Sequence, residues 1–415
     1  MFKILITPKI FFTNDKLKNI KQSLINVGTL GHVSHGKTFF IKQLTTKNTN
    51  KFTDEEKRGI SIKLGYTNCS IFKVKKKKIK FLLKSFSKHI KNDTPTFRFS
   101  FIDCPGHKML LTTMLTGASL MDSILFFVSV NDLFPQEQTI EHLLSLNVYK
   151  FSKLIIILSK VDLGSFMKIL YIYLVSNSFF KKKNIKNKIF LNTCFFNINL
   201  NFISYEIMKL NSCVFRKINN HTLFVIIRVF NTKDKKKVIG GTLIQGFLQK
   251  GIVAEIKPGI SENKLLKHKK ILTKIVEIRD NETILNFVIP GGLIGLLTEI
   301  DTDSNCNNNF IGHFIGLPGK MPKIYKKILI KYYIFRNFKK LLINEFNEEG
   351  LFPSKTIITV NSANIIGSIK KMNRKYMLIF LDEQTCILKY QKIIISTKSG
   401  NNWSLLAWGK FIQGE

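Results

Sequence analysis

The sequence GHVSHGKT at positions 31–38 restricts what this chain can fold into more than any other feature. It matches the pattern GxxxxGK[ST], follows the apolar run 23–31 and opens the helix-like segment 37–46. Glycines let backbone N–H groups curl around a phosphate, and a helix N-terminus adds positive potential. We therefore expect a P-loop in which Lys37 reaches the β- and γ-phosphates and Thr38 binds Mg²⁺. The residues expected to contact the nucleotide here are Gly31, Val33, Ser34, His35, Gly36, Lys37, Thr38 and Phe39.

The rest of the first half alternates apolar runs with amphipathic segments. The runs 97–104, 123–130 and 153–160 are continuously apolar, as in parallel strands buried on both faces, and 107–116 and 136–149 are helix-like. This alternation predicts a doubly wound α/β domain with a mostly parallel sheet. From about residue 220 short β-rich runs and Pro-Gly turns predict two β-barrels. The expected division is an N-terminal extension (1–24), the α/β domain (25–215) and barrels at 220–316 and 320–415.

A second motif, DCPGH at 103–107, closes an apolar strand. In this position after a P-loop, Asp103 is expected to hold Mg²⁺ through water. The N–H of Gly106 is expected to sense the γ-phosphate. His107 stands where a side chain can orient the attacking water, so we predict it as the catalytic residue.

A third motif, Ser159-Lys160-Val161-Asp162, is similar to the Asn-Lys-x-Asp element that recognises guanine. Asp162 can accept hydrogen bonds from the ring N–H and the amine of guanine, and adenine cannot reciprocate. The stem of Lys160 can stack on the base. Ser159 replaces the usual Asn, which is expected to weaken both the base contact and the brace to the P-loop. Thr193 and Cys194 are the candidates for a further contact with the guanine oxygen.

The charge balance points to a polyanionic partner. Lys and Arg number 65 against 27 Asp and Glu, a formal net charge of +38. Nucleic acid is the commonest such partner. A coding bias toward Lys, Asn, Ile and Phe would give the same excess, so both origins remain open. The basic run at 73–80 is expected to lie in a solvated loop, with a phosphate-contact patch as the alternative.

The cysteine pattern and the length of the apolar runs indicate in which cellular compartment the protein is expected. Six cysteines form no CxxC pair, which argues against a disulfide framework and a cysteine zinc ribbon. No apolar run approaches the roughly 18–20 residues of a membrane span, and the N-terminus makes a poor signal peptide. We expect a cytoplasmic protein without a membrane partner.

With these motifs in place, the chain resembles the gamma-subunit family of eukaryotic and archaeal translation initiation factor 2. The likeness rests on NVGTLGHVSHGKT, ISIKLGYTN, DCPGHKMLLTTMLTGASLMD and PQEQTIEHL in the first domain. It continues in GGTLIQGFLQKGIVAEIKPGI, PGGLIGLLTEID and WSLLAWGKF. Elongation factor Tu and its selenocysteine-specific relative share GHVxHGKT and DCPGH, but KLGY, PGGLIGLLTEID and LLAWGKF favour the initiation factor.

The resemblance implies a slow, partner-stimulated GTPase that uses GTP, GDP and Mg²⁺ and carries methionyl initiator tRNA to the small ribosomal subunit. It implies alpha and beta subunits, a GTPase-activating partner and an exchange factor. Translation GTPases carry a switch-loop Thr whose hydroxyl binds Mg²⁺, and Ser61 keeps that hydroxyl. Tyr66 in KLGY can stack on the terminal tRNA base or pack on the core.

The departures from the family leave alternatives open. Many members carry a cysteine zinc knuckle before DCPGH, where this chain offers only Cys69, His89 and lysines, so we expect no zinc. The Ser159 substitution motivates a second hypothesis, a non-cycling tRNA-binding scaffold with a degenerate G domain. A third is an elongation-type carrier of other aminoacyl-tRNAs.

Overall fold

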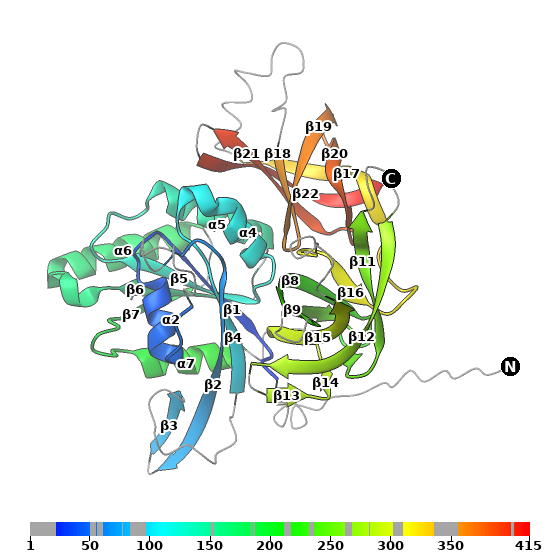
Figure 1. Ribbon diagram of the computed structural model, residues 1–415. Coiled ribbons are helices and arrows are strands. Elements are labelled where there is room, and N and C mark those ends of the chain that lie inside the picture. The colour runs from blue at the N-terminus through cyan, green and yellow to red at the C-terminus, as the bar shows by residue number, and fades with distance from the viewer. Residues whose placement is uncertain are drawn as a thin grey trace.

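The computed structural model shows three packed units: an α/β domain and two β-barrels (Figure 1). The barrel nearer the α/β domain in sequence is called domain II and the C-terminal barrel domain III. The residues that the structure describes are 22–49, 55, 61–76, 78–83, 97–149, 151, 153–183, 185, 187–210, 217–231, 236–261, 268–281, 283–301, 310–335, 356–399 and 402–415.

The α/β domain is built on a seven-stranded sheet of order β3-β2-β4-β1-β5-β6-β7. The five strands from β4 to β7 pair in parallel, and β2 pairs antiparallel with β3 and β4. The strands are β1 (Asn26–Gly31), β2 (Gly65–Lys76), β3 (Lys78–Leu83), β4 (Phe97–Asp103), β5 (Ser123–Ser129), β6 (Lys153–Ser159) and β7 (Asn187–Leu191). The predicted mostly parallel sheet is therefore confirmed. The basic run 73–80 falls on β2 and β3, so the expectation of a solvated loop there was wrong.

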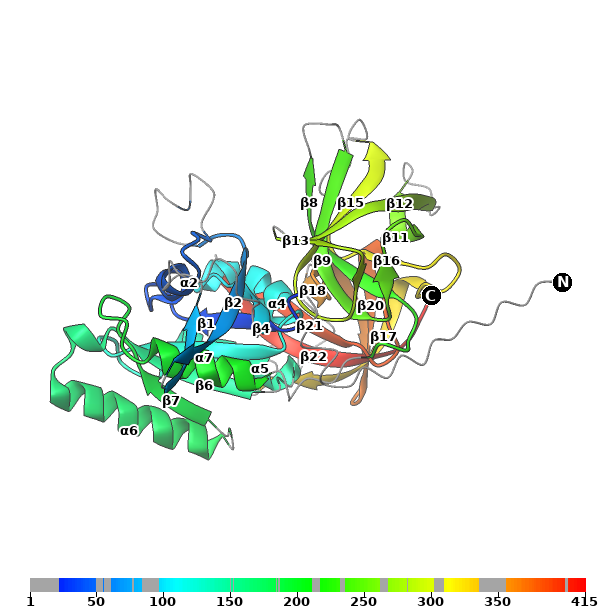
Figure 2. The same ribbon diagram turned by 90° about the horizontal axis from the view of Figure 1, so that it is seen from below.

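Helices cover both faces of this sheet because its central strands are apolar on both sides. On β5, Phe126 packs with α4, α5 and α6, whereas Phe127 packs with α2 and α7. Figure 2 shows α6 at the outer edge of the domain, away from the barrels. The helices are α2 (Lys37–Thr45), the 3₁₀ turn η2 (Lys108–Leu110), α4 (Leu111–Ala118), α5 (Glu137–Tyr149), the 3₁₀ turn η3 (Val161–Leu163), α6 (Phe166–Lys182) and α7 (Leu200–Lys209).

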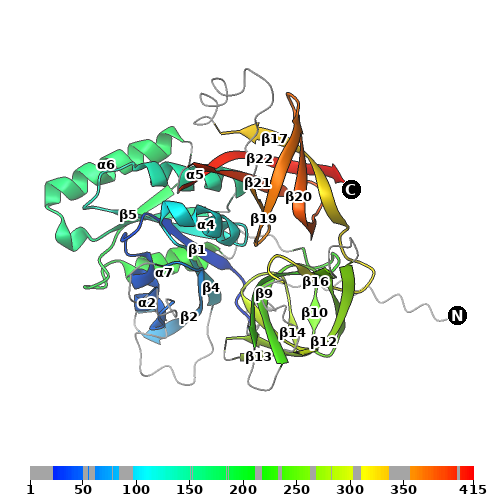
Figure 3. The same ribbon diagram turned by 45° about the horizontal axis from the view of Figure 1, so that its top comes forward.

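Domain II closes on itself through the order β11-β16-β8-β9-β15-β12, with β12 pairing back to β11 and β13 added beside β12. Figure 3 looks into this ring. Its strands are β8 (Leu223–Asn231), β9 (Lys236–Gln245), β10 (Leu248–Gln249), β11 (Val253–Ser261), β12 (His268–Asp280), β13 (Thr283–Leu285), β14 (Phe287–Val288), β15 (Ile294–Asp301) and β16 (Phe314–Gly316). Alternate inward side chains such as Phe224, Ile226 and Leu296 form its core.

Domain III is a closed barrel of order β17-β20-β19-β18-β21-β22. Its strands are β17 (Ile324–Ile334), β18 (Thr356–Val360), β19 (Ala363–Met372), β20 (Tyr376–Cys386), β21 (Lys392–Ser399) and β22 (Asn402–Gly414). Both predicted barrels are thus confirmed. The described helices all lie in the α/β domain, and both tryptophans, Trp403 and Trp408, lie in domain III.

Hydrogen bonds join the three domains. Asn26 of β1 donates to Thr242 Oγ1 of domain II over 3.3 Å, and Ser119 Oγ after α4 donates to Asn361 O of domain III over 2.7 Å. Ser362 Oγ donates to Ile226 O over 2.7 Å and joins the barrels. Gln22, which falls within the predicted extension, is buried and its amide donates to Ile289 O over 2.8 Å. The α/β domain is therefore joined to both barrels, and the barrels are joined to each other.

Candidate nucleotide site

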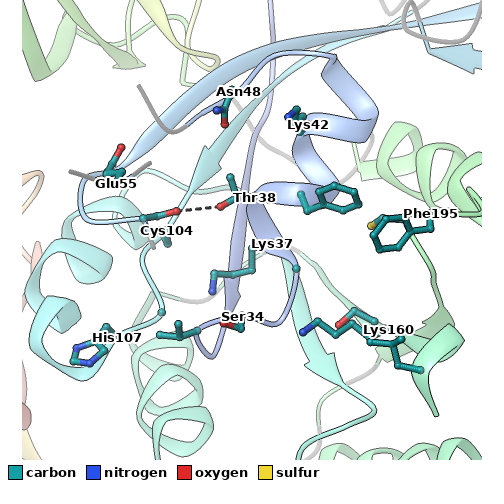
Figure 4. A pocket seen from close by; sticks show the side chains of 18 of the residues that line it. Ser34, Lys37, Thr38, Lys42, Asn48, Glu55, Cys104, His107, Lys160 and Phe195 are labelled. Atoms are coloured by element: carbon teal, nitrogen blue, oxygen red, sulfur yellow. Dashed lines mark hydrogen bonds between the residues drawn. The ribbon is translucent and has the colours of Figure 1, made fainter. Parts of the chain in front are cut away.

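A cavity of about 650 Å³ opens at the carboxyl ends of the parallel strands, where open α/β sheets bind ligands (Figure 4). The P-loop, DCPGH, the Ser-Lys-Val-Asp motif and the loop after β7 all contribute to its wall. The predicted residues that line it are Val33, Ser34, Gly36, Lys37, Thr38, Phe39, Ser61, Gly106, His107, Ser159, Lys160, Asp162 and Cys194. Four motifs spread over more than 160 residues of sequence therefore converge on one pocket.

The P-loop bends sharply into α2 at Gly36, whose φ of 87° is in the left-handed region that glycine favours. Lys37 follows, and its Nζ donates to Gly31 O over 2.9 Å and to His32 O over 2.7 Å. The ammonium thus lies inside the curve of the loop. Burial lowers the pKa of Lys37 to about 8.

Asp103, at the end of β4, is fully buried and gathers three hydroxyl groups. Thr29 Oγ1 donates to its Oδ1 over 2.8 Å. Thr38 and Thr49 donate to its Oδ2 over 2.7 Å and 2.8 Å. The hydroxyl of Ser61 lies 3.0 Å from that of Thr38. The three residues expected to hold Mg²⁺ are therefore in one cluster.

Two residues of this region were missed in the sequence. Thr49 completes the cluster on Asp103, and Glu55 lines the pocket while its Oε1 accepts the N–H groups of Ile62 and Lys63 over 2.9 Å and 2.8 Å. Glu55 thereby holds the segment that follows Ser61. Residues 57–60 of the predicted switch run lie outside the described residues.

Gly106 is pressed against the P-loop. A Cβ at this position would lie 2.7 Å from Gly31 O and 2.7 Å from Lys37 Nζ, so only glycine fits. His107 lines the pocket on the side opposite Phe195 in Figure 4, and its Nδ1 accepts the N–H of Met109 over 3.3 Å. Since Nδ1 accepts that bond, the neutral ring carries its hydrogen on Nε2.

The side chain of His35 lies behind the P-loop, not in the pocket that it was expected to line. It is buried, its Nδ1 lies 3.0 Å from Phe127 O, and its Nε2 lies 3.2 Å from Asp132 Oδ2. Burial lowers its pKa to about 4, so the ring is neutral near pH 7 and donates from Nδ1 to the carbonyl. His35 therefore supports the loop through its side chain.

A brace between Ser159 and the P-loop, which the change from Asn is expected to weaken, is present in the structure. Ser159 is buried, and its Oγ donates to His35 O over 2.7 Å and lies 3.3 Å from Val128 O. The short side chain reaches because β6 runs beside β5, with Ser159 opposite Ser129. Val161 is only partly buried and packs toward the core rather than lining the pocket.

Of the two residues predicted on the loop after β7, Cys194 lines the pocket and Thr193 does not. Cys194 lines the wall, and burial raises the pKa of its thiol to about 12. Thr193 is buried outside the wall, and its Oγ1 has no hydrogen-bond partner. Next along the chain, Phe195 lines the wall although no motif marked it.

The remaining predicted features lie elsewhere. Tyr66 lines a separate pocket of about 310 Å³ between β2 and domain II. Among the described residues no group of three or more His, Cys, Asp or Glu could hold a metal ion; Cys69 is buried, and His89 lies outside those residues. Within the described part of the chain no helix is long and apolar enough to cross a membrane.

Comparison with known proteins agrees with this geometry. Residues 22–209 match the family described as the elongation factor Tu GTP binding domain, and residues 327–411 match the C-terminal domain family of initiation factor eIF2 gamma. A translation initiation factor 2 subunit gamma of Methanocaldococcus jannaschii is 32% identical over 95% of this chain and 98% of its own length. Subunit 3 of the Drosophila melanogaster factor is 29% identical over 95% of this chain and 90% of its own length.

Solved structures show the same fold. Elongation factor SelB of Methanococcus maripaludis with a GTP analogue superposes with a TM-score of 0.71 at 17% identity, over 95% of this chain and 80% of that one. A bacterial selenocysteine-specific elongation factor gives 0.72 at 19% identity over 94% of this chain, which spans only 58% of that protein's length. The chain is a GTP-binding translation GTPase, and it belongs to the gamma-subunit family of translation initiation factor 2.

Proposed function

We propose that this chain binds Mg²⁺-GTP in the 650 Å³ pocket and uses the state of the γ-phosphate to control its hold on methionyl initiator tRNA. One observation carries the proposal. Thr38 of the P-loop, Ser61 of the switch segment and Asp103 of DCPGH come from three separate segments, yet they lie within one chain of hydrogen bonds. A ligand that engages this cluster holds all three segments together, and its loss releases them.

The donor set of the cluster fits Mg²⁺. It consists of one carboxylate and of hydroxyl oxygens, which are the hard ligands that this ion takes, and it contains no thiol or imidazole. We propose that Thr38 and Ser61 bind the ion directly and Asp103 through water. When bound there, Mg²⁺ neutralises charge on the phosphates of the nucleotide.

The remaining site residues receive these roles. Lys37 pairs with the β- and γ-phosphates, and the Gly106 N–H reports the γ-phosphate because Gly106 already touches the P-loop. Asp162 accepts the ring N–H and amine of guanine, and the wall at Lys160 and Cys194 contacts the rest of the base. His107 orients the attacking water from its place on the wall.

We propose the 310 Å³ pocket between β2 and domain II for the acceptor end of the tRNA. The guanidinium carbon of Arg228 lies 4.9 Å from the centre of the Tyr66 ring, and Arg279 lines the same pocket. The Tyr66 hydroxyl is buried without a hydrogen-bond partner. Tyr66 therefore acts together with Arg228, which supplies charge for the phosphate backbone, rather than as an open stacking face by itself.

The test is binding of methionylated initiator tRNA to the purified chain with a GTP analogue, GDP or an ATP analogue, each with Mg²⁺. Tight binding with the GTP analogue alone supports the proposal. Binding that ignores the nucleotide would instead identify a non-cycling scaffold. An aminoacylated elongator tRNA is the control ligand. Equal affinity for the initiator and the elongator tRNA would favour an elongation-type carrier.

The family points to the remaining partners, which we also propose for this chain: alpha and beta subunits, the small ribosomal subunit, a GTPase-activating protein and an exchange factor, all in the compartment where translation occurs. Co-purification of the tagged full chain followed by mass spectrometry tests the subunits. Recovery of the chain alone at low salt would contradict the assignment of a multi-subunit factor.

A further inference from the structure

The turn between β12 and β13 of domain II is bound by three separate segments of the α/β domain. Asp280 ends β12 and pairs with Thr283, which begins β13. Asp280 Oδ2 accepts the N–H of Ser23, and its Oδ1 accepts the side-chain amide of Asn68. Arg98 Nη1 donates to Thr283 Oγ1 over 3.0 Å. The turn is therefore joined to the chain before β1, to β2 and to β4.

These three segments lead to the nucleotide pocket. β1 runs into the P-loop, β4 ends at Asp103, and β2 begins shortly after Ser61. Ser23 and Arg98 lie at the amino ends of β1 and β4, whereas the nucleotide pocket lies at the carboxyl ends of the parallel strands. The β12–β13 turn therefore contacts the sheet away from the edge that holds the nucleotide.

The neighbours of Asp280 belong to the pocket proposed for the acceptor end of the tRNA. Arg279 and Asn281 line that 310 Å³ pocket, and so does Asn68, whereas Asp280 itself does not. A second cavity, of about 400 Å³, also borders the turn at Asp280 and Asn281. Because side chains beside a cavity lose packing partners, the position of this turn depends strongly on its hydrogen bonds.

The carboxylate of Asp280 is suited to hold the turn. It is only 3% exposed, and each of its oxygens accepts one hydrogen bond from the α/β domain. Burial raises the pKa of this carboxyl, whereas the bonds from Ser23 and Asn68 and the charge of Arg98 lower it. Hydrogen bonds to a charged acceptor are among the strongest in proteins, so their loss should release the turn.

We propose that Asp280 is the positioning residue of the acceptor-end pocket: its two hydrogen bonds hold Arg279 and Asn281 in place beside β2. Asp280 would then set the affinity for the tRNA without contacting it. This inference rests on the proposed function of the 310 Å³ pocket and adds a residue on which that function depends.

The test exchanges the two side chains of the Asp280–Asn68 hydrogen bond. In Asn68→Asp two carboxylates stand side by side, and their repulsion should separate the turn from β2. The double variant combines Asn68→Asp with Asp280→Asn. The amide at position 280 can then accept the Ser23 N–H and donate to the carboxylate at position 68, so that both bonds are restored.

The affinities to measure are those for methionylated initiator tRNA with a GTP analogue and Mg²⁺, and for fluorescent GDP. We expect Asn68→Asp to raise the Kd of the tRNA by roughly tenfold to a hundredfold, because only the chains with the turn in place are competent to bind. The double variant should return this Kd to within about threefold of the wild type. The Kd of GDP should stay within about twofold in both variants, since the turn contacts the sheet away from the nucleotide.

Ser119→Ala is the control. It removes the hydrogen bond of Ser119 Oγ to Asn361 O, which joins the α/β domain to domain III, and it should leave the Kd of the tRNA unchanged. Should Asn68→Asp fail to fold, as judged by helical circular dichroism, Asn68→Ala removes the same bond without repulsion. It should raise the Kd of the tRNA by about fivefold or more.

Three results would overturn the inference. A double variant that binds the tRNA as weakly as Asn68→Asp would show that the new charge repels the tRNA directly. Equal losses of GDP and tRNA affinity would show a general defect of the chain, and wild-type tRNA affinity in the single variants at position 68 would show that the bond has no role. If the wild-type chain itself does not bind methionylated initiator tRNA, the proposed function fails, and this inference falls with it.

Discussion

The hydrogen bond from Ser159 to the P-loop allows the sharpest test of how this chain departs from its family. In Ser159→Ala, the carbonyl oxygen of His35 loses the hydroxyl that now lies 2.7 Å away. Ser159 is only 3% exposed, so water does not readily replace the donor. A buried acceptor left unpaired costs about 1–3 kcal/mol, which is the expected loss of G-domain stability.

The same loss is expected to appear in nucleotide binding. The N–H groups that follow His35 form the phosphate cradle, so a loop that must be re-formed on binding raises Kd by roughly fivefold to a hundredfold. The assay pairs urea unfolding with GDP binding. Helical circular dichroism reports the G domain, since the described helices all lie there, and tryptophan fluorescence reports domain III through Trp403 and Trp408.

Ser204→Ala is the control. Ser204 is also buried, and its hydroxyl donates over 2.7 Å to Leu200 O, within α7 and far from the P-loop in sequence. Its loss should leave the GDP affinity unchanged. If Ser159→Ala keeps both the G-domain midpoint and the GDP affinity of the wild type, the brace has no energetic role and the reasoning is wrong.

Three further changes address other parts of the site. His107→Ala should lower the partner-stimulated rate of phosphate release by about 10²–10⁴-fold with GTP affinity within about twofold; a matching loss of affinity would contradict its proposed role. Gly106→Ala should abolish measurable GTP binding, because its Cβ would lie 2.7 Å from Gly31 O. A GTP affinity equal to that of the wild type would show that the P-loop can move away from the added methyl group. Burial lowers the pKa of His142 to about 3, so the unfolded chain takes up a proton below pH 6.5 that the native chain does not. Burial does the same to His35, whose pKa is about 4, so each of these two histidines should cost about 1.6 kcal/mol of stability between pH 6.5 and pH 5. His142→Gln should therefore remove about half of this slope, and the same change at exposed His221 should not.

Much of the fold could be predicted because hydrophobic periodicity reports it directly. The continuous apolar runs became β1, β4, β5 and β6, each buried on both faces, and the short runs after residue 220 became closed barrels. The basic run at 73–80 misled because lysine content says nothing about pairing. Its alternating Val74 and Lys75 pair with β3 as an ordinary antiparallel ladder.

The site was predictable where a motif fixes the backbone and unpredictable where a lone side chain completes a contact. The P-loop, DCPGH and Ser-Lys-Val-Asp segments each reached the pocket. Thr49, Glu55 and Phe195 carry no such signal, since a threonine, a glutamate or a phenylalanine outside a motif is common on any surface. Only the path of the chain brings Thr49 within 2.8 Å of Asp103.

The cluster on Asp103 explains how one carboxylate can serve both the resting and the nucleotide-bound states. A hydroxyl is a donor and an acceptor at once, so Thr38, which lines the pocket, can donate to Asp103 Oδ2 and still offer a lone pair to a ligand. Thr29 and Thr49 hold the carboxylate from β1 and from the loop after α2, and neither lines the pocket. Thr29 and Thr49 therefore hold Asp103 in place, and its third hydroxyl partner, Thr38, is the one that can contact a bound ligand. Removing either fixed hydroxyl should weaken Mg²⁺-dependent GTP binding more than Mg²⁺-independent binding, which titration of Thr49→Val with and without chelator would measure.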